Sequence, residues 1–163
     1  EEDILFLYLT SHGSKSHELS VRLGGISLPN ITPQNIADAI ENSGIRWRVV
    51  IISACYSGGF MPALQSDDAL IITAARADRK SFGCDDEREM TYFGEAFFKH
   101  ALPLASSFEE VFRIASDKIS GWESERHPDD EHSEPQISIG KNIVDQLALW
   151  RKSHEYYPAS PTN

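Results

Sequence analysis

Three short, almost unbroken apolar runs constrain the fold of this chain more than any other feature. They span residues 3–10 (DILFLYLT), 47–54 (WRVVIISA) and 69–75 (ALIITAA). Their length suits strands, and runs that are apolar at successive positions are typical of a parallel sheet covered on both faces. The sequence therefore predicts an α/β fold with a mostly parallel sheet flanked by helices.

The segments around these runs carry helix and turn signals. Thr32 and Pro33 read as N-cap and first residue of a helix that Gly44 ends. Thr91 opens a second helix, and Ser107 with Glu110 forms a capping-box pattern before a third. The other expectations are a hairpin over 19–28 around a Gly-Gly pair, an acidic mobile loop over 123–134, a short strand over 136–139 and a helix over 142–152.

Length and charge limit the number of domains and the class of partner. The 163 residues fit one domain, which we expect to span residues 1–155 with a loose tail over 156–163. A net charge of −10 argues against nucleic acid as a partner. No apolar run approaches the length of a membrane span, and the two cysteines have no zinc-ligand spacing. Each cysteine is therefore either a core residue or a residue with a chemical role.

Candidate catalytic residues follow two of the predicted strands. The first run leads into Ser11-His12-Gly13, and the second leads into Cys55 and a glycine pair. Parallel neighbours bring His12 and Cys55 to the same edge of the sheet, where ligands bind in open α/β folds. An imidazole can activate a thiol as nucleophile, and the N–H groups of Gly13 and Cys55 can hold a developing oxyanion.

Other interpretations of these residues compete with catalysis. A cysteine after an apolar strand, taken alone, is usually a small buried hydrophobe, and a lone histidine usually has a structural role. A serine hydrolase using Ser57 is disfavoured, because the G-x-S-x-G pattern needs a glycine where this chain has Cys55. A non-enzymatic interaction domain that docks through its acidic 123–134 segment is the remaining alternative.

The paired motifs SHG and SACYSGG resemble those of clan CD cysteine peptidases, and most closely those of the legumain-like (asparaginyl endopeptidase) family. Further family-like motifs occur in the right order: TAA at 73–75, SFGC at 81–84, DDE at 85–87 and TYFG at 91–94. His12 precedes Cys55 by 43 residues, against about 50 in caspases. The resemblance covers roughly residues 3 to 100, and we expect a bacterial member of the family.

The resemblance implies a caspase-like three-layer sandwich and a cysteine endopeptidase acting through a Cys-His dyad and a thioester acyl-enzyme. Cys55 is then the nucleophile, His12 the base, and Gly13 with Cys55 the oxyanion donors. The substrate-binding positions it implies are Ser53, Ser81, Asp85 and Asp86, and Cys84 matches a non-catalytic cysteine. No metal or organic cofactor is implied. A transpeptidase or transamidase of the same fold and a non-catalytic pseudo-peptidase are the alternatives.

The chain departs from the family pattern in two places. Ser53 stands where legumain has a glutamate, so the implied cleavage after Asn or Asp does not carry over as a strict Asn preference. Nothing corresponds to the family's amino-terminal strand and helix, so we expect a missing segment, or a second chain, to complete the sheet. The implied partner is a peptide or protein substrate, and family members commonly work outside the cytosol.

Overall fold

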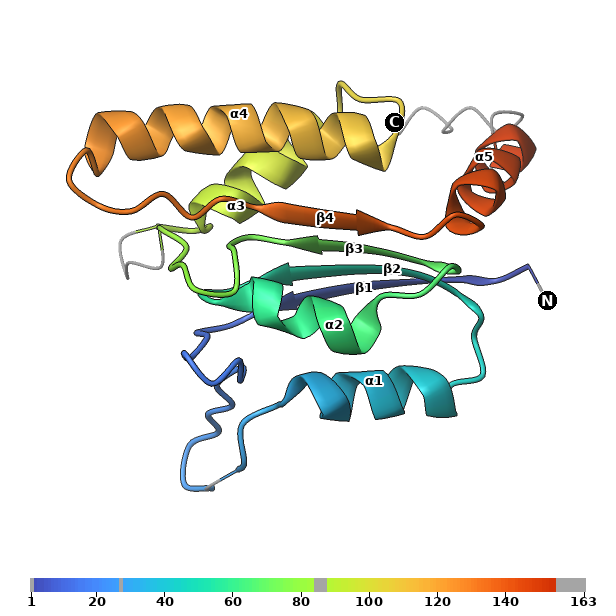
Figure 1. Ribbon diagram of the computed structural model, residues 1–163, viewed down its shortest axis with the longest axis horizontal. Helices are drawn as coiled ribbons and strands as arrows, with labels where there is room; N and C mark the ends of the chain where they lie inside the picture. The colour runs from blue at the N-terminus through green and yellow to red at the C-terminus, as the bar shows by residue number, and fades with distance from the viewer. Residues whose placement is uncertain (1, 27, 84–87, 155–163) are drawn as a thin grey trace, which may run out of the picture.

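The computed structural model describes residues 2–26, 28–83 and 88–154. Its centre is a four-stranded sheet with the strand order β1-β2-β3-β4 (Figure 1). The strands are β1 (Ile4–Thr10), β2 (Trp47–Ser53), β3 (Ala69–Thr73) and β4 (Gln136–Ile139). β1, β2 and β3 run parallel, and β4 runs antiparallel to β3. The three apolar runs are therefore strands, as predicted.

The register aligns the carboxyl ends of the three parallel strands. Thr10 at the end of β1 lies opposite Ser53 at the end of β2. Ile52 of β2 lies opposite Thr73 at the end of β3. Because the strands end level with one another, the segments that follow them leave the sheet at the same edge.

Helices cover both faces of the sheet (Figure 1). One face carries α1 (Pro33–Asn42), the 3-10 turn η1 (Ser57–Phe60) and α2 (Met61–Leu64). The other carries α3 (Tyr92–Gly94), the π-helix η2 (Glu95–Ala101) and α4 (Phe108–Arg126), and α5 (Ile143–His154) follows β4.

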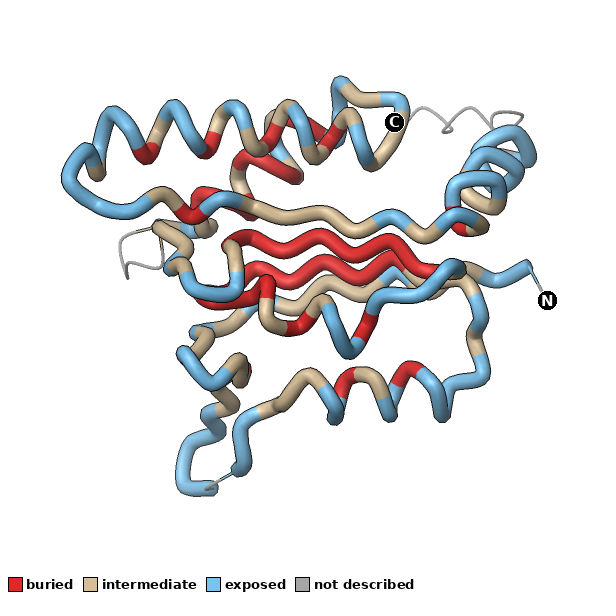
Figure 2. The backbone as a smooth tube through the Cα atoms, in the orientation of Figure 1, coloured by how far each residue is buried: buried red, intermediate tan, exposed pale blue. Residues whose placement is uncertain are grey.

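Residues along β2 alternate between the two faces, because successive side chains of a strand point to opposite sides. Val49 and Ile51 pack in the core with η2 and α4, and Val50 and Ile52 pack with α1 and α2. β2 and β3 are buried over most of their length (Figure 2). This is the predicted three-layer α/β fold.

The predicted starts of the helices are confirmed. Thr32 caps α1 by accepting a hydrogen bond from the Asn35 N–H, and Pro33 is the first helical residue. Thr91 caps α3 in the same way through the Gly94 N–H. The helix that Thr91 opens then changes to π geometry in η2, where the Leu102 N–H reaches back five residues to the Phe97 carbonyl.

Among the described residues of 19–28, the predicted hairpin is not present as a pair of strands. Leu23 and Ile26 form a single bridge around the Gly-Gly turn, and Leu19 pairs instead with Gly13 and Ile31. Pro29 has no N–H to donate, so a ladder cannot continue through it.

The acidic segment over 123–134 is not wholly a loop, because α4 continues through Arg126. Glu123 follows Ala115 and Ile119 at helical spacing and is buried with them. Its carboxylate accepts hydrogen bonds from the N–H (3.0 Å) and the hydroxyl (2.5 Å) of Ser133. The α4–β4 connection, residues 127–135, is therefore anchored to the helix.

β1 is the edge strand of the described sheet, and Phe6 on it is 48% exposed. The predicted completion of the sheet beside β1 stays a prediction. The predicted tail, 156–163, lies outside the described residues. None of the helices within the described part of the chain is long and apolar enough to cross a bilayer.

Candidate active site

The loop after β1 packs directly on the turn after β2. A Cβ atom added to Gly13 would lie 1.9 Å from the carbonyl oxygen of Cys55, so only a glycine backbone fits there. The N–H of Ser11 donates to the Ser53 carbonyl (3.3 Å) and continues the pairing of the two strands. His12, between Ser11 and Gly13, is exposed. The structure thus brings the backbones of the predicted base and nucleophile together.

The Cys55 sulfur lies against the loop that follows β3. It accepts a hydrogen bond from the N–H of Ser81 (3.3 Å). It also lies 3.5 Å from the Ser81 carbonyl and 3.7 Å from the Ser81 hydroxyl. Cys55 is only partly buried, so the thiol is supported by Ser81 and still open on another side.

The turn after Cys55 is tight. Tyr56 has a left-handed backbone (φ 57°, ψ 19°), and its N–H donates to the Arg79 carbonyl (2.7 Å). The Gly58 N–H donates to the Ala75 carbonyl (2.8 Å), and a Cβ on Gly58 would lie 2.6 Å from the backbone nitrogen of Ala77. The segment after β3 therefore fixes the path of this turn, residues 55–59, which carries the candidate nucleophile and is called the nucleophile turn below.

Two backbone donors at this edge have no partner inside the described chain. Gly13 bridges to Leu19, but the hydrogen bonds of that bridge run between its neighbours, from Ser14 N to Glu18 O and from Ser20 N to His12 O. Neither the Gly13 N–H nor the Cys55 N–H donates to another described residue. Free, preorganised N–H groups of this kind can receive an oxyanion without first breaking a bond.

Ser57 does not have the geometry of a nucleophile. It is fully buried, accepts a hydrogen bond from the Ala75 N–H (3.1 Å) and donates to the Ala75 carbonyl (3.4 Å). Its hydroxyl joins the nucleophile turn to the end of β3, so the structure argues against a serine hydrolase.

His17 is a site residue that the sequence did not reveal. Its Nδ1 lies 3.1 Å from the carbonyl oxygen of Tyr56, and its ring lies against Gly59, where an added Cβ would come within 2.1 Å of it. No motif or spacing marks this histidine, because the contact depends on the path of the loop.

Of the four predicted pocket residues, the structure describes Ser53 and Ser81, which lie at the same edge in different environments. Ser53 is buried, and its hydroxyl shares a hydrogen bond with that of Thr91 (3.0 Å). Ser81 contacts the Cys55 sulfur, as described above. Asp85 and Asp86 lie outside the described residues, and so does Cys84.

A pocket of about 310 Å³ opens beside these residues. Tyr8 and Thr10 of β1 line one side, and Gly83 with residues 88–91 lines the other. Thr10 is two positions before His12, and Thr91 is the partner of Ser53. The pocket therefore adjoins the carboxyl edge that carries both candidate catalytic residues.

Arg88 in the pocket lining forms an ion pair that no sequence motif indicates. Arg88 donates to the Glu95 carboxylate at 2.6 Å, and its guanidinium lies over the Tyr92 ring, 4.7 Å from the centroid. Glu89 also lines the pocket. Arg88, Glu89 and Glu95 together carry a net charge of −1.

Ion pairs support the loop after β3 from outside. Arg76 donates to Asp78 through Nε (2.6 Å) and Nη2 (3.0 Å), and these hydrogen bonds lower the pKa of Asp78 to about 2. Arg76 also pairs with Glu134, and Arg79 pairs with Glu131 (3.0 Å). The acidic side chains of the α4–β4 connection thus bind the loop that holds the nucleophile turn.

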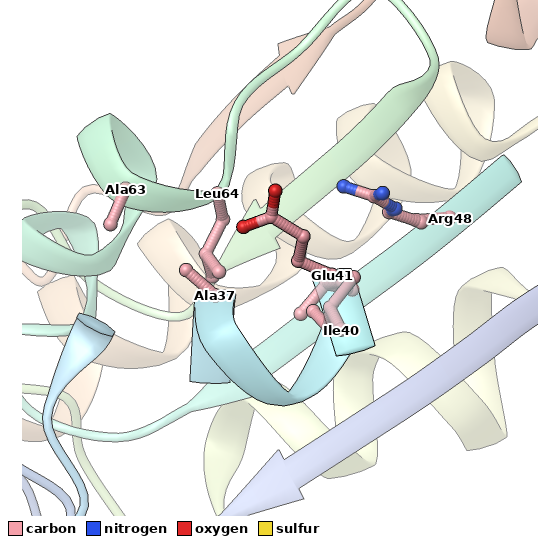
Figure 3. Close-up of a pocket in the computed structure, with 7 residues that line it drawn as sticks. Ala37, Ile40, Glu41, Arg48, Ala63 and Leu64 are labelled. Atoms are coloured by element: carbon pink, nitrogen blue, oxygen red, sulfur yellow. The ribbon is translucent and has the colours of Figure 1, made fainter. Parts of the chain in front are cut away.

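A second pocket, of about 260 Å³, lies between α1, α2 and β2 (Figure 3). Glu41 and Arg48 both line it, and the guanidinium of Arg48 points toward the side chain of Glu41. Arg48 is seven positions before Cys55, a distance of about 20 Å along an extended strand. This pocket is separate from the candidate active site.

No group of three or more His, Cys, Asp or Glu side chains in the described ranges is arranged to hold a metal ion. The chemistry available at this edge is that of a thiol, an imidazole and free backbone N–H groups.

The chain matches the family model of the Peptidase C13 family over residues 1–143, a range that contains His12, Cys55 and the pocket. No curated protein matches the chain. A match over most of the chain, together with the α/β fold, shows that the chain belongs to the peptidase C13 family, the legumain family of clan CD cysteine peptidases.

Proposed function

We propose that this chain carries the catalytic centre of a cysteine endopeptidase, with Cys55 as nucleophile and His12 as general base. The observation that carries the proposal is the contact between Gly13 and the Cys55 carbonyl. That contact joins the loop of His12 to the turn of Cys55, so the two catalytic groups belong to one packed unit. Membership of a family of cysteine peptidases supports the same chemistry.

The reaction proceeds through a thioester. Cys55 gives its proton to His12, and its sulfur attacks the carbonyl carbon of the scissile peptide bond. The N–H groups of Gly13 and Cys55 hold the oxyanion that forms. His12 then protonates the leaving amine, and the carbon–nitrogen bond breaks to leave an acyl-enzyme. Water, deprotonated by His12, hydrolyses the thioester and restores the thiol.

The pocket beside Thr91 is the proposed site for the side chain that precedes the cleaved bond. Its lining includes Arg88, which Glu95 already neutralises, together with the hydroxyl-bearing side chains of Tyr8, Thr10 and Thr91. Because Glu89 adds a further negative charge, a neutral amide side chain fits better than a carboxylate at neutral pH. We therefore propose a preference for Asn over Asp, with Ser53 and Ser81 behind the pocket and Asp85 and Asp86 as further expected contacts.

A paired histidine substitution tests the assignment of the base. His12→Ala should lower kcat for a peptide substrate about 10²–10⁴-fold, because a general base is lost. His132→Ala, on the α4–β4 connection, is the matched control and should keep the activity of the unmodified chain. Equal activity in both variants would contradict the role of His12.

The same acyl-enzyme can also be resolved by an amine, which makes the chain a transpeptidase or transamidase. Mass spectrometry of the products with an added peptide acceptor separates the two outcomes, because only transpeptidation joins the acceptor to the acyl group.

A pseudo-peptidase that docks partners through its acidic segment is the weaker alternative. Glu123, Glu131 and Glu134 of that segment are engaged in contacts within the chain. We also propose that a further segment or a second chain pairs with β1. The expected result concerns the β1 amides that point away from β2: they should exchange quickly in this chain alone and become protected when that segment or second chain is present.

A further inference from the structure

The loop between His12 and Leu19 contacts the nucleophile turn at two points. Gly13 packs on the carbonyl of Cys55, and His17, four positions further along the loop, meets Tyr56 and Gly59. Only the first contact involves the proposed catalytic groups. The second has no role in the mechanism given above.

The second contact joins two residues with unusual backbones. His17 has φ 59° and Tyr56 has φ 57°, both in the left-handed region that residues other than glycine rarely occupy. Such conformations persist where the surrounding contacts hold them, and they concentrate at functional sites.

Each of the two conformations has identifiable supports. The His17 N–H donates to the Ser14 carbonyl (2.9 Å), which closes a turn within the loop. The Tyr56 carbonyl receives the Gly59 N–H (3.1 Å) and faces Nδ1 of His17 (3.1 Å). A carbonyl oxygen can only accept, so Nδ1 of His17 must carry the proton, and the histidine donates.

The absence of a side chain on Gly59 leaves room for the imidazole ring. A Cβ at that position would lie 2.1 Å from two ring atoms of His17, a separation at which something must move. The ring is therefore held between the Gly59 backbone and the Tyr56 carbonyl, in one orientation.

We propose that His17 is a positioning residue that keeps the Tyr56 peptide in its left-handed conformation and so fixes where the Cys55 sulfur faces relative to His12. The inference rests on the proposed function, since it concerns the alignment of that dyad. His17 reaches the reacting atoms only through Tyr56, and it takes no proton in the reaction.

Two substitutions of His17 distinguish the contribution of its imidazole ring from that of its left-handed backbone conformation. His17→Gly tolerates the positive φ and removes the hydrogen bond. His17→Asn also tolerates the left-handed region and keeps an N–H donor on a short side chain. Lys15→Ala, at an exposed position of the same loop, is the matched control.

The readouts are kcat and KM for a peptide substrate and the rate of Cys55 alkylation by iodoacetamide, followed by intact mass. For His17→Gly we expect kcat to fall about 10–100-fold with KM nearly unchanged, because the reacting atoms are misaligned while the pocket is intact. Alkylation should slow in parallel. His17→Asn should recover most of both rates, and Lys15→Ala should match the unmodified chain.

Gly59→Ala tests the same contact without a substitution of His17. The added Cβ displaces the ring, so the same loss of kcat and of alkylation rate is expected even if His17→Gly folds poorly. Unchanged alkylation and kcat in folded His17→Gly or Gly59→Ala, or no recovery in His17→Asn, would overturn the proposal. Because alkylation of Cys55 does not need turnover of a peptide substrate, it tests the position of the thiol separately from the proposed function. A failure of Cys55→Ala to abolish cleavage would instead refute the proposed function.

Discussion

The backbone N–H of Ser81 donates a hydrogen bond to the sulfur of Cys55 across 3.3 Å. Ser81 belongs to the loop after β3, and Cys55 to the turn after β2. Gly13, from the loop after β1, packs on the carbonyl of the same cysteine. The candidate active site is therefore assembled from the segments that follow three adjacent parallel strands, with Cys55 at their meeting point.

Gly13→Ala should lower activity strongly. The new methyl group would lie 1.9 Å from the Cys55 carbonyl oxygen, so the two loops must separate. Displacing one oxyanion donor costs about 10²–10³ in kcat. Steady-state kinetics on peptide substrates would measure the loss.

Gly24→Ala is the control for that substitution, because an added Cβ there meets nothing within 4 Å. It should leave kcat unchanged. A Gly13→Ala variant as active as Gly24→Ala would contradict the close packing of the two loops and the role of Gly13.

Thr91→Val should destabilise the chain and disturb the pocket together. Thr91 Oγ1 caps α3 through the Gly94 N–H and is the hydrogen-bond partner of buried Ser53. Losing the cap costs about 1 kcal/mol, and leaving the Ser53 hydroxyl without a partner costs about 1–3 kcal/mol more. Urea unfolding would measure the free energy, and KM would report on the pocket.

Ser107→Ala is the matched cap substitution, since Ser107 caps α4 through the Glu110 N–H (3.2 Å) and lies outside the pocket lining. It should cost about 1 kcal/mol of stability and leave KM unchanged. A rise in KM of the same size in both variants would contradict the expectation that the pocket depends on the Ser53–Thr91 hydrogen bond.

Glu123→Ala should be the most destabilising substitution of an acidic residue in α4. It leaves two buried donors of Ser133 without their acceptor, at about 1–3 kcal/mol each. Exposed Glu125→Ala should change the free energy of unfolding by no more than about 0.5 kcal/mol. In a double-mutant cycle with Ser133→Ala, an interaction energy near zero would contradict the buried contact.

The pair between Asp78 and Arg76 should make the stability of the chain depend on pH in the acid range. The pKa of Asp78 is lowered from 3.8 to about 2 in the folded chain, mainly by the hydrogen bonds from Arg76. The stabilisation is therefore present above the unfolded pKa and is lost as the pH falls from about 4 to about 2. Denaturant unfolding at several acidic pH values would show a shallower decline for Asp78→Asn; an identical decline in both proteins would exclude this contribution.

The sheet and the meeting of the catalytic loops could be predicted from the sequence because their causes are local. A run such as Trp47–Ser53 is apolar on both faces, which identifies a buried parallel strand without knowledge of its neighbours. Parallel strands end at one edge, so the positions after β1 and β2 had to lie close together.

Other parts of the site depend on contacts between residues far apart in the sequence, which a pattern does not reveal. Glu123 looks like part of an acidic, solvated segment until Ser133 returns to satisfy its carboxylate. His17 and Tyr56 are 39 residues apart in the sequence, and both have left-handed backbones where they meet. The Arg88–Glu95 pair joins a loop to a helix whose relative placement no motif specifies.

The most direct test of the central claim is cleavage of a fluorogenic peptide library, varied at the residue before the cleaved bond, by the chain and by its Cys55→Ala variant. We expect cleavage by the unmodified chain, strongest after Asn, and complete loss in the variant with its circular dichroism spectrum unchanged. Cleavage at the same rate by both proteins would contradict the assignment of Cys55 as the nucleophile.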